Sequence, residues 1–367
     1  MNLKKILIVL TTLALLLLID HRETTPSVPE TTAPTQIETE APIQIRTGWF
    51  TIGSNRYCYS PEGQPLTGWL TDEGDRFYLD ETGMALTGWQ ELEDKQFYFA
   101  EDGAMAVGWA TLDGSTYYFG MDGSLFTGLL NIGGEGYFFT ESGRMHTGWL
   151  ELDGRTYYFD SQGVMAVGQV EIEGQLHHFS PRGVKVLLVN PWNSLPEDYE
   201  VTLVNVTSQD RLETACAEAL EKMLADCKLA GYKTMIVSGY RTQEDQEFLY
   251  NRKVNSYLHM GWDLERARKE AATEVAVPGT SEHQLGLAVD IIDVNYGYLD
   301  SRQAQMPAQK WLMAHCHEYG FILRYPVGST EITGIIYEPW HYRYVGVEMA
   351  QEITDLGITL EEYLGAA

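Results

Sequence analysis

The sequence predicts two domains: a solenoid of 20-residue β-hairpin repeats, followed by an α+β domain with a mostly antiparallel sheet. Three observations lead to this prediction. Glycines recur with a period of twenty from Gly48 to Gly168. After residue 185 the repeat stops, and helical and strand patterns follow one another without strict alternation. With 367 residues the chain is long enough for two domains.

Residues 1–19 are predicted to be a signal peptide or a signal anchor. Lys4 and Lys5 precede an uncharged, mainly aliphatic run, Ile6 to Ile19, which is typical of a signal-peptide core and short for a membrane span of about 20 residues. No Ala-x-Ala cleavage site follows cleanly, so an uncleaved membrane anchor is the alternative. In both cases we expect the rest of the chain to be exported, with membrane contact only through residues 6–19.

Residues 20–45 are rich in Thr, Pro and Glu and have too few apolar residues for a core. They are predicted to form a solvated, fairly extended linker.

Residues 46–185 are predicted to form the repeat array. Trp follows the periodic glycine in five units, and an aromatic cluster such as residues 157–159 recurs nine to eleven residues after that glycine. A fixed period of this size indicates a stacked array. Within one unit, residues 149–159 form two strand-like runs around Asp153-Gly154, which predicts a hairpin with a mirror-type turn. Because a lone hairpin is not stable in water, neighbouring hairpins must bury each other's aromatic rings.

The period and the recurring TGW and YYF segments resemble the choline- and glucan-binding cell-wall repeats of surface proteins. The resemblance implies a cell-wall polysaccharide or teichoic acid as partner, and the candidate ligand-binding residues are Trp69, Trp89, Trp109 and Trp149. Choline-type repeats usually carry another Trp before the YY pair, whereas this chain has residues such as Arg76 and Gln96 there. A choline cage needs several aromatic faces, so a wall sugar and an amine both stay open as ligands. The alternative is that most of these rings serve only as hairpin core.

Residues 186–367 are predicted to form the α+β domain. A helix capped by Ser208 is expected to end at Gly231. Its buried face would carry Leu212, Cys216, Leu220, Met223 and Cys227. The two cysteines would be separated by about 16 Å along the helix axis, too far for a disulfide. Together with the absence of any CxxC spacing among the four cysteines, this predicts no disulfide framework.

The remaining elements of this domain alternate irregularly. Residues 234–238 are expected to form a strand, and Thr242 with Asp245 forms a capping-box-like start for the next helix. A further helix is expected over 307–319, and strands over 321–325 and 335–344. The helix at 307–319 carries His315 and His317, which we reject as metal ligands because residues two apart on a helix do not face one point.

Two short stretches carry the residues for chemistry: SEHQLGLAVD, residues 281–290, and EPWH, residues 338–341. Two His and one carboxylate are the ligand set of a catalytic zinc that keeps one position open for water, and a further carboxylate can act as general base. Seven residues of straight strand would hold His283 and Asp290 about 23 Å apart. The chain must therefore fold back between them, and Gly286 permits a sharp turn before a buried strand over 287–292.

The stretches SGYR (238–241), PGTSEHQLGLAVDI (278–291) and EPWHYRYVG (338–346) resemble the zinc D-alanyl-D-alanine carboxypeptidases of the VanY type. The resemblance covers roughly residues 186–367. It implies that zinc binds to His283, Asp290 and His341. It further implies Glu338 as the base, Arg241 as the residue that steadies negative charge on the substrate carbonyl, and Ser281 as the residue that binds the terminal carboxylate of the peptide.

The two resemblances together imply a cell-wall-targeted enzyme that removes the C-terminal D-alanine from peptidoglycan stem peptides, with the repeats tethering it near its substrate. An L,D-carboxypeptidase and a peptidoglycan endopeptidase are alternatives on the same site. An alternative of another class is a non-catalytic cell-wall-binding surface protein. The net charge of −27 argues against a nucleic-acid partner, because neutralising phosphates takes clustered Lys and Arg.

Overall fold

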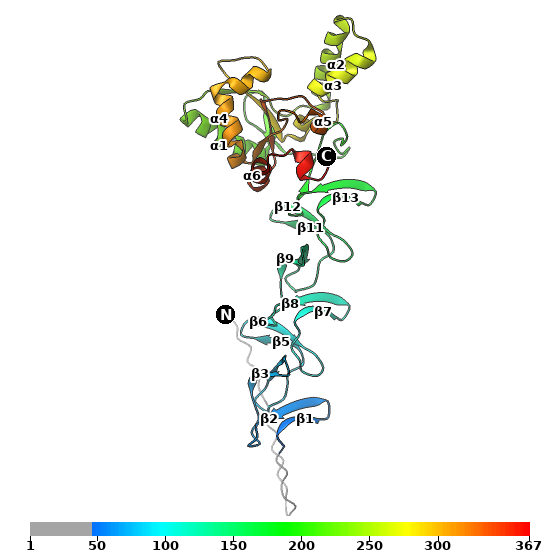
Figure 1. The fold of residues 1–367 in the computed structure, drawn as a ribbon, viewed down its shortest axis with the longest axis vertical. Coiled ribbons are helices and arrows are strands. Elements are labelled where there is room, and N and C mark those ends of the chain that lie inside the picture. Colours follow the sequence, from blue (N-terminus) through cyan, green and yellow to red (C-terminus); the bar gives the residue numbers. More distant parts are fainter. Residues whose placement is uncertain (1–45) are drawn as a thin grey trace, which may run out of the picture.

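The computed structural model describes residues 46–367 and shows a column of hairpins with a globular domain at one end (Figure 1). The predictions for residues 1–45, a targeting segment and a linker, lie outside the described residues. Within 46–367, none of the helices combines the length and the apolar character that crossing a membrane requires.

The first domain is a stack of seven antiparallel hairpins, and a short third strand joins the last one. The paired strands are β1 Gly48–Ile52 with β2 Asn55–Tyr59, β3 Gly68–Asp72 with β4 Asp75–Leu79, β5 Gly88–Leu92 with β6 Lys95–Phe99, β7 Gly108–Leu112 with β8 Ser115–Phe119, β9 Gly128–Ile132 with β10 Glu135–Phe139, β11 Gly148–Leu152 with β12 Arg155–Phe159, and β13 Gly168–Ile172 with β14 Gln175–Phe179 and β15 Lys185–Val186.

The hairpins close and stack as the period predicts. At the tip of the sixth hairpin, Asp153 and Gly154 have φ of +50° and +71°, the backbone of a mirror-type turn. Backbone hydrogen bonds join successive units, such as the 2.8 Å bond from the Leu125 amide to the Gln96 carbonyl. From the third hairpin onward, the last ring of each aromatic cluster is fully buried; these rings belong to Phe99, Phe119, Phe139, Phe159 and Phe179. The predicted hairpin solenoid is therefore confirmed.

The second domain contains a four-stranded, fully antiparallel sheet in the order β18-β19-β21-β20. These strands are Thr234–Ser238, Ala288–Asp293, His341–Tyr344 and Phe321–Leu323, in that order. The mostly antiparallel α+β prediction is thus confirmed. In the register of the sheet, Asp290 on β19 lies opposite Ser238 on β18 and opposite His341 on β21.

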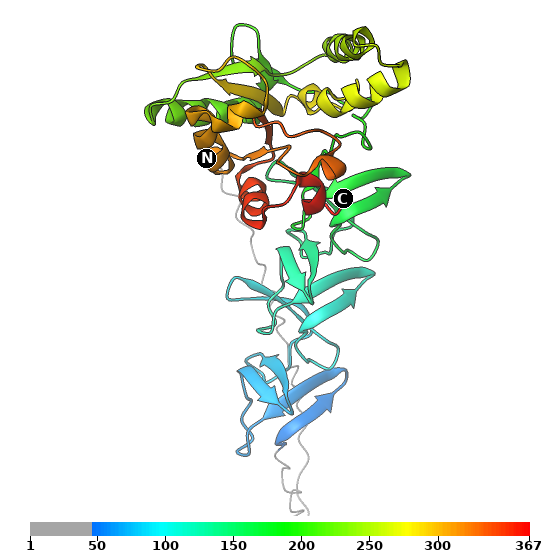
Figure 2. The same cartoon turned by 45° about the horizontal axis from the view of Figure 1, so that its top comes forward.

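Helices surround this sheet. They are α1 Thr214–Leu229, α2 Gln243–His259, α3 Leu264–Glu274, α4 Pro307–His315, α5 Thr330–Thr333, α6 Val347–Leu356 and α7 Leu360–Tyr363, with 3-10 turns η1 Glu282–Leu285, η2 Ser301–Gln305 and η3 Cys316–Tyr319 and a small hairpin of β16 Leu203–Asn205 and β17 Arg211–Glu213. Leu220 and Met223 of α1 pack with Val289 and Ile291 of β19 in the main core. Figure 2 shows α2 and α3 side by side at one end of the domain, away from α1.

Helix α1 begins later than the sequence predicts. Its N-cap is Glu213, whose carboxylate accepts hydrogen bonds from the amides of Ala215 and Cys216, and Ser208 lies outside the helix. Leu212 belongs to β17, where it pairs with Val204, yet it is fully buried in the core that α1 covers. The helical period extended to Leu212 because a buried strand residue fits the same apolar spacing.

Three other predicted boundaries are also too wide. The strand expected over 335–344 comprises only His341–Tyr344, because Pro339 cannot donate to a ladder and the amide of Glu338 bonds to the Tyr325 carbonyl instead. The strand expected over 321–325 ends at Leu323. The helix expected over 307–319 ends at His315 and continues as the 3-10 turn η3.

The two domains contact each other at the last hairpin. The guanidinium of Arg182 pairs with Glu348 and Glu352 on α6, and the Gln169 side chain donates a 3.0 Å hydrogen bond to the Gly365 carbonyl. Leu188, just after β15, is buried against α6 and α7. The junction is therefore a packed contact, which holds the array and the α+β domain against each other.

Candidate metal centre

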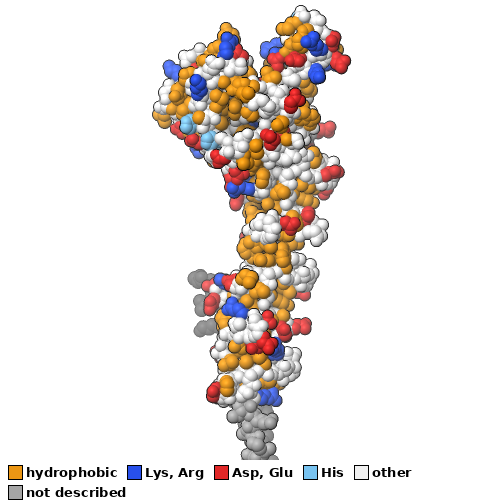
Figure 3. All heavy atoms as spheres, viewed as in Figure 1, with side chains coloured by type: hydrophobic (Ala, Val, Ile, Leu, Met, Phe, Trp, Pro, Cys, Tyr) orange, Lys and Arg blue, Asp and Glu red, His pale blue; other side chains and the backbone are white. Residues whose placement is uncertain are grey.

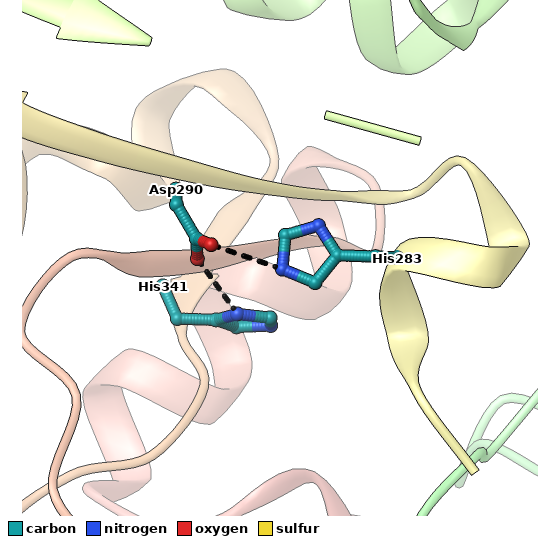
Figure 4. A group of neighbouring side chains, drawn as sticks. All are labelled: His283, Asp290 and His341. Carbon is teal, nitrogen blue, oxygen red and sulfur yellow. Dashed lines mark hydrogen bonds and ion pairs between the residues drawn. The ribbon is translucent and has the colours of Figure 1, made fainter. Parts of the chain in front are cut away.

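The candidate site lies where β19, β21 and η1 meet (Figure 4). Asp290 and His341 are cross-strand neighbours, so the sheet itself places their side chains together. His283 lies on η1, and Gly286 directly after η1 has φ of +73°, which turns the chain back into β19. A Cβ atom on Gly286 would lie 3.0 Å from Leu203 Cδ2. The predicted fold-back at Gly286 is therefore what brings His283 to Asp290.

The three predicted ligands form one buried cluster. Their ligand atoms all lie within 4.8 Å of one another. The Oδ2 atom of Asp290 lies 3.3 Å from His283 Nε2, and Oδ1 lies 3.1 Å from His341 Nδ1. The two imidazole rings are nearly perpendicular, with centroids 4.9 Å apart. All three side chains in Figure 4 point at one centre.

The tautomer of His283 follows from its hydrogen bond. Its Nδ1 atom lies 2.7 Å from the carbonyl oxygen of Gly239, an acceptor only, so Nδ1 carries the proton and Nε2 presents a lone pair to Asp290. On His341 it is Nδ1 that faces Asp290. Two imidazole nitrogens and a carboxylate converging on one point are the donor set of a zinc site with an open position. The residues therefore fit a zinc ion.

Glu338 lies beside this cluster. Its Oε2 atom is 3.8 Å from His341 Nδ1, and the loop before β21 carries it. Burial raises the pKa of Glu338 to about 8. A carboxyl group held near neutrality beside a metal-ligand cluster has the position and the pKa of a general base.

Without a metal, His341 holds a proton. Burial lowers its pKa, but the neighbouring carboxylates of Asp290 and Glu282 outweigh burial and raise the pKa to about 9. His283 behaves oppositely, because burial and the nearby Arg241 charge lower its pKa to about 4. Burial alone would raise the pKa of Asp290, but His283 and His341, together with Arg241, hold it well below its usual range.

Arg241 and Ser281 line the same cleft as the cluster. This cavity has a volume of about 560 Å³, and the cluster and Glu338 line it as well. Arg241 follows β18 and donates from Nη2 to Asp290 Oδ2 at 2.8 Å and from Nε to Ser238 Oγ at 2.9 Å. The predicted capping box of Thr242 starts α2 directly after it. The structure thus brings together all six residues singled out in this domain, whereas His315 pairs with Glu318 outside the cluster.

Sequence reasoning missed Glu282. This residue is 1% exposed, and its Oε2 atom lies 3.5 Å from His341 Nε2. Burial would raise the pKa of Glu282, but Arg324 and Arg343 hold it well below its usual range. The sequence does not indicate that Glu282 is buried beside His341. A Glu next to a predicted ligand looks like an ordinary polar residue, and its two arginine partners are about 40 and 60 positions away.

In the array, the predicted tryptophans are half-buried at the edges of the hairpins. Trp89 and Trp109 are 40% and 43% exposed and contact the first ring of the next cluster, Tyr117 or Tyr137, in T-shaped pairs. Cavity-lining residues at Trp89 include Gln96 and Arg144 as well as Tyr117. Figure 3 shows hydrophobic side chains in a band along the array.

Cations of the chain itself cover three tryptophan rings of the array, those of Trp49, Trp69 and Trp149. The Arg56 guanidinium carbon lies 4.4 Å from the ring centroid of Trp49, and that of Arg76 lies 4.3 Å from Trp69. The ammonium of Lys185 lies 4.8 Å from the centroid of Trp149. These are the distances at which a ligand ammonium would stack on the rings.

Both domains match models of known protein families. Residues 209–347 match the family model described as VanY D-alanyl-D-alanine carboxypeptidase. The chain carries a VanY-type carboxypeptidase domain. Residues 86–127, 126–167 and 146–186 match the choline-binding repeat, and residues 67–83 match a cell wall binding repeat. The two predicted resemblances are therefore confirmed.

Individual relatives resemble one domain or the other. A D-alanyl-D-alanine carboxypeptidase of Enterococcus faecalis is 42% identical over 179 residues, which are 49% of this chain and 65% of that protein. The chain therefore spans just under two thirds of this relative. A solved vancomycin-resistance D,D-pentapeptidase VanY in complex with Zn(II) is 41% identical, with coverage of 48% of this chain and 97% of that one and a TM-score of 0.45. Choline binding protein F of Streptococcus pneumoniae is 30% identical, with coverage of 43% and 55% and a TM-score of 0.37.

Proposed function

We propose that the protein is an exported, cell-wall-targeted zinc carboxypeptidase that removes the C-terminal D-alanine from peptidoglycan stem peptides. The observation that carries the proposal is the buried cluster of His283, Asp290 and His341 with Glu338 beside it in one cleft. His283 would hold zinc through Nε2 and His341 through Nδ1, the atoms that face Asp290. When bound, zinc supplies Lewis-acid chemistry: it polarises a carbonyl and lowers the pKa of water toward neutrality.

Glu338 moves the proton in this mechanism. Its carboxylate accepts a proton from the attacking water and later returns it to the leaving amine. Its position suits both steps, because its Oε2 atom lies 3.8 Å from His341 Nδ1 in the same cleft. The open cleft around Glu338 leaves room for the end of a peptide.

Arg241 and Ser281 would hold the substrate. The guanidinium of Arg241 lies at the cluster, next to the place where negative charge develops on the substrate carbonyl. A preorganised donor of this kind is worth roughly 3–4 kcal/mol. Ser281 precedes η1 in the wall of the cleft and would bind the terminal carboxylate of the peptide.

The array would bind a wall polysaccharide and so raise the local substrate concentration. Choline is the less favoured ligand, because Arg56 and Arg76 already cover the faces of Trp49 and Trp69. The groove at Trp89 offers an aromatic face beside amide, hydroxyl and guanidinium groups, which suits a sugar. Retention on purified walls, with and without teichoic acid, tests this: Trp89→Ala should weaken retention, and Trp69→Ala should not.

Digestion of defined penta-, tetra- and cross-linked muropeptides, followed by mass measurement of the products, tests the activity. The proposal expects loss of one terminal D-alanine from the pentapeptide, with no release by Glu338→Gln, which should keep its zinc. Shortening of the tetrapeptide instead would indicate an L,D-carboxypeptidase, and cleavage of cross-links an endopeptidase. Wild-type protein that releases nothing from any substrate would favour a non-catalytic wall-binding protein.

A further inference from the structure

We propose that Glu282 is a positioning residue of the metal centre, which accepts a hydrogen bond from Nε2–H of His341 and so keeps Nδ1 of that ring directed at Asp290. The inference rests on the proposed zinc site and adds to it a residue that neither touches the metal nor the substrate.

The first observation is a pair of facing, unpartnered atoms. Among the described residues, Glu282 Oε2 and His341 Nε2 are both buried side-chain atoms without a hydrogen-bond partner. They lie 3.5 Å apart, at the limit of a hydrogen bond. Buried polar atoms are rarely left unpaired. A hydrogen bond between them would satisfy both atoms.

The second observation is that the Glu282 carboxylate has a fixed orientation. Its Oε1 atom accepts hydrogen bonds from Arg324 Nε at 2.8 Å and from Arg343 Nη1 at 2.9 Å. Two guanidinium groups therefore hold one oxygen, and the other oxygen is left facing His341. A ligating imidazole usually donates its second N–H to such a carboxylate, which sets its tautomer and its orientation.

The third observation is that the two arginines that hold Glu282 are themselves held by other groups. Arg324 also forms two hydrogen bonds to the Glu361 carboxylate on α7, and all three side chains are fully buried. The negative charges of Glu282 and Glu361 balance the positive charges of Arg324 and Arg343, so the four side chains together are neutral. Arg343 Nη2 donates to the carbonyl of Leu187 at 2.9 Å. The support of His341 thus extends to the segment that joins the two domains.

A purely structural role for Glu282 makes a different prediction. In that case the carboxylate only offsets the charges of Arg324 and Arg343, and the metal site would not depend on it. Glu361 provides a matched control, because it is a buried carboxylate on the same Arg324 but contacts Asn190 on its other side and not His341.

The experiment compares zinc affinity, by competition with a chelator, and thermal unfolding in wild type, Glu282→Gln and Glu361→Gln. We expect Glu282→Gln to bind zinc about 10–100-fold more weakly. Both variants should unfold at lower temperature, and Glu361→Gln should keep zinc affinity within about threefold. Equal zinc affinity in Glu282→Gln and wild type, or equal losses in the two variants, would overturn the inference. Wild type that binds no zinc would instead overturn the proposed function.

A measurement on the wild type covers the case in which Glu282→Gln does not fold. In ¹⁵N-histidine-labelled protein loaded with zinc, nitrogen chemical shifts identify the protonated atom of His341, with His341→Gln as the assignment control. The inference expects a proton on Nε2, slow to exchange with solvent, and a metallated Nδ1. A metallated Nε2, or an Nε2 proton that exchanges as freely as in unfolded protein, would contradict it.

Discussion

Zinc affinity should rise steeply with pH, because binding displaces protons from two buried side chains. In the metal-free protein the pKa of His341 is about 9 and that of Glu338 is about 8, so both groups are protonated below pH 7.5. Zinc needs the Nδ1 lone pair of His341, and the nearby cation favours the ionised form of Glu338. His283, with a pKa of about 4, is already neutral and releases none.

Two displaced protons correspond to about a hundredfold gain in zinc affinity per pH unit, or about 1.4 kcal/mol for each proton. The slope should hold from about pH 6 to 7.5 and flatten as the pH rises through the two pKa values. Chelator competition at fixed ionic strength measures the affinity, and calorimetry in buffers with different ionisation enthalpies counts the released protons.

Glu338→Gln is the matched control, because it removes one of the two protons and leaves His341 in place. Its affinity should rise only about tenfold per pH unit. A wild-type affinity that does not change over this range would refute the reasoning on His341. Equal slopes in the two proteins would refute the reasoning on Glu338.

Four further outcomes follow from the structure. First, without zinc, the fold should lose stability as the pH rises from about 4.5 to 8, because buried Glu338 must ionise; the contribution of protonated His341, fully present below pH 6.5, should be lost as the pH rises through about 9. Denaturant unfolding with and without chelator measures this decline. If both groups keep their ordinary pKa values, no such zinc-sensitive decline will be seen. Second, Arg324→Met should cost about 3–5 kcal/mol in urea unfolding, because it leaves two buried carboxylates short of a partner, whereas Arg302→Ala on the surface should cost less than about 1 kcal/mol; similar losses would contradict the role of burial. Third, Gly286→Ala should lower both stability, by about 1–2 kcal/mol, and zinc affinity, since φ is +73° and the new methyl group approaches Leu203; unchanged zinc affinity would show that this turn does not set the place of His283. Fourth, Phe139→Ala in the array should cost about 3–5 kcal/mol and leave zinc affinity unchanged, which calorimetric unfolding and chelator competition together can check.

The ligand set was predictable because short motifs mark its residues. Two motifs supplied the two imidazoles and the two carboxylates predicted for the site, Asp290 and Glu338, and Gly286 marked the turn between His283 and Asp290. The array was predictable for a similar reason, since each glycine of the twenty-residue period repeats one local backbone conformation. In both cases local sequence features mark the residues, although the contact of His341 with Asp290 also needs the pairing of β21 with β19.

The parts that escaped prediction depend on distant contacts. The burial of Glu282 depends on its contacts with Arg324 and Arg343, which the pairing of β20 with β21 brings side by side. The predicted start of α1 was wrong because Leu212 fits a helical period, although it lies in a strand and pairs with Val204. Likewise the covering of Trp49 by Arg56 depends on side-chain directions across the hairpin, which the spacing of residues does not fix.

The donor set of the bound metal is the most direct test of the account. X-ray absorption at the zinc edge of the full chain, loaded with one equivalent of zinc, reports the type and distance of the coordinating atoms. We expect two imidazole nitrogens and additional oxygens at about 2.0–2.2 Å, with loss of one imidazole contribution in His341→Gln. A sulfur shell at about 2.3 Å, or a spectrum that His341→Gln leaves unchanged, would contradict a centre built from His283, Asp290 and His341.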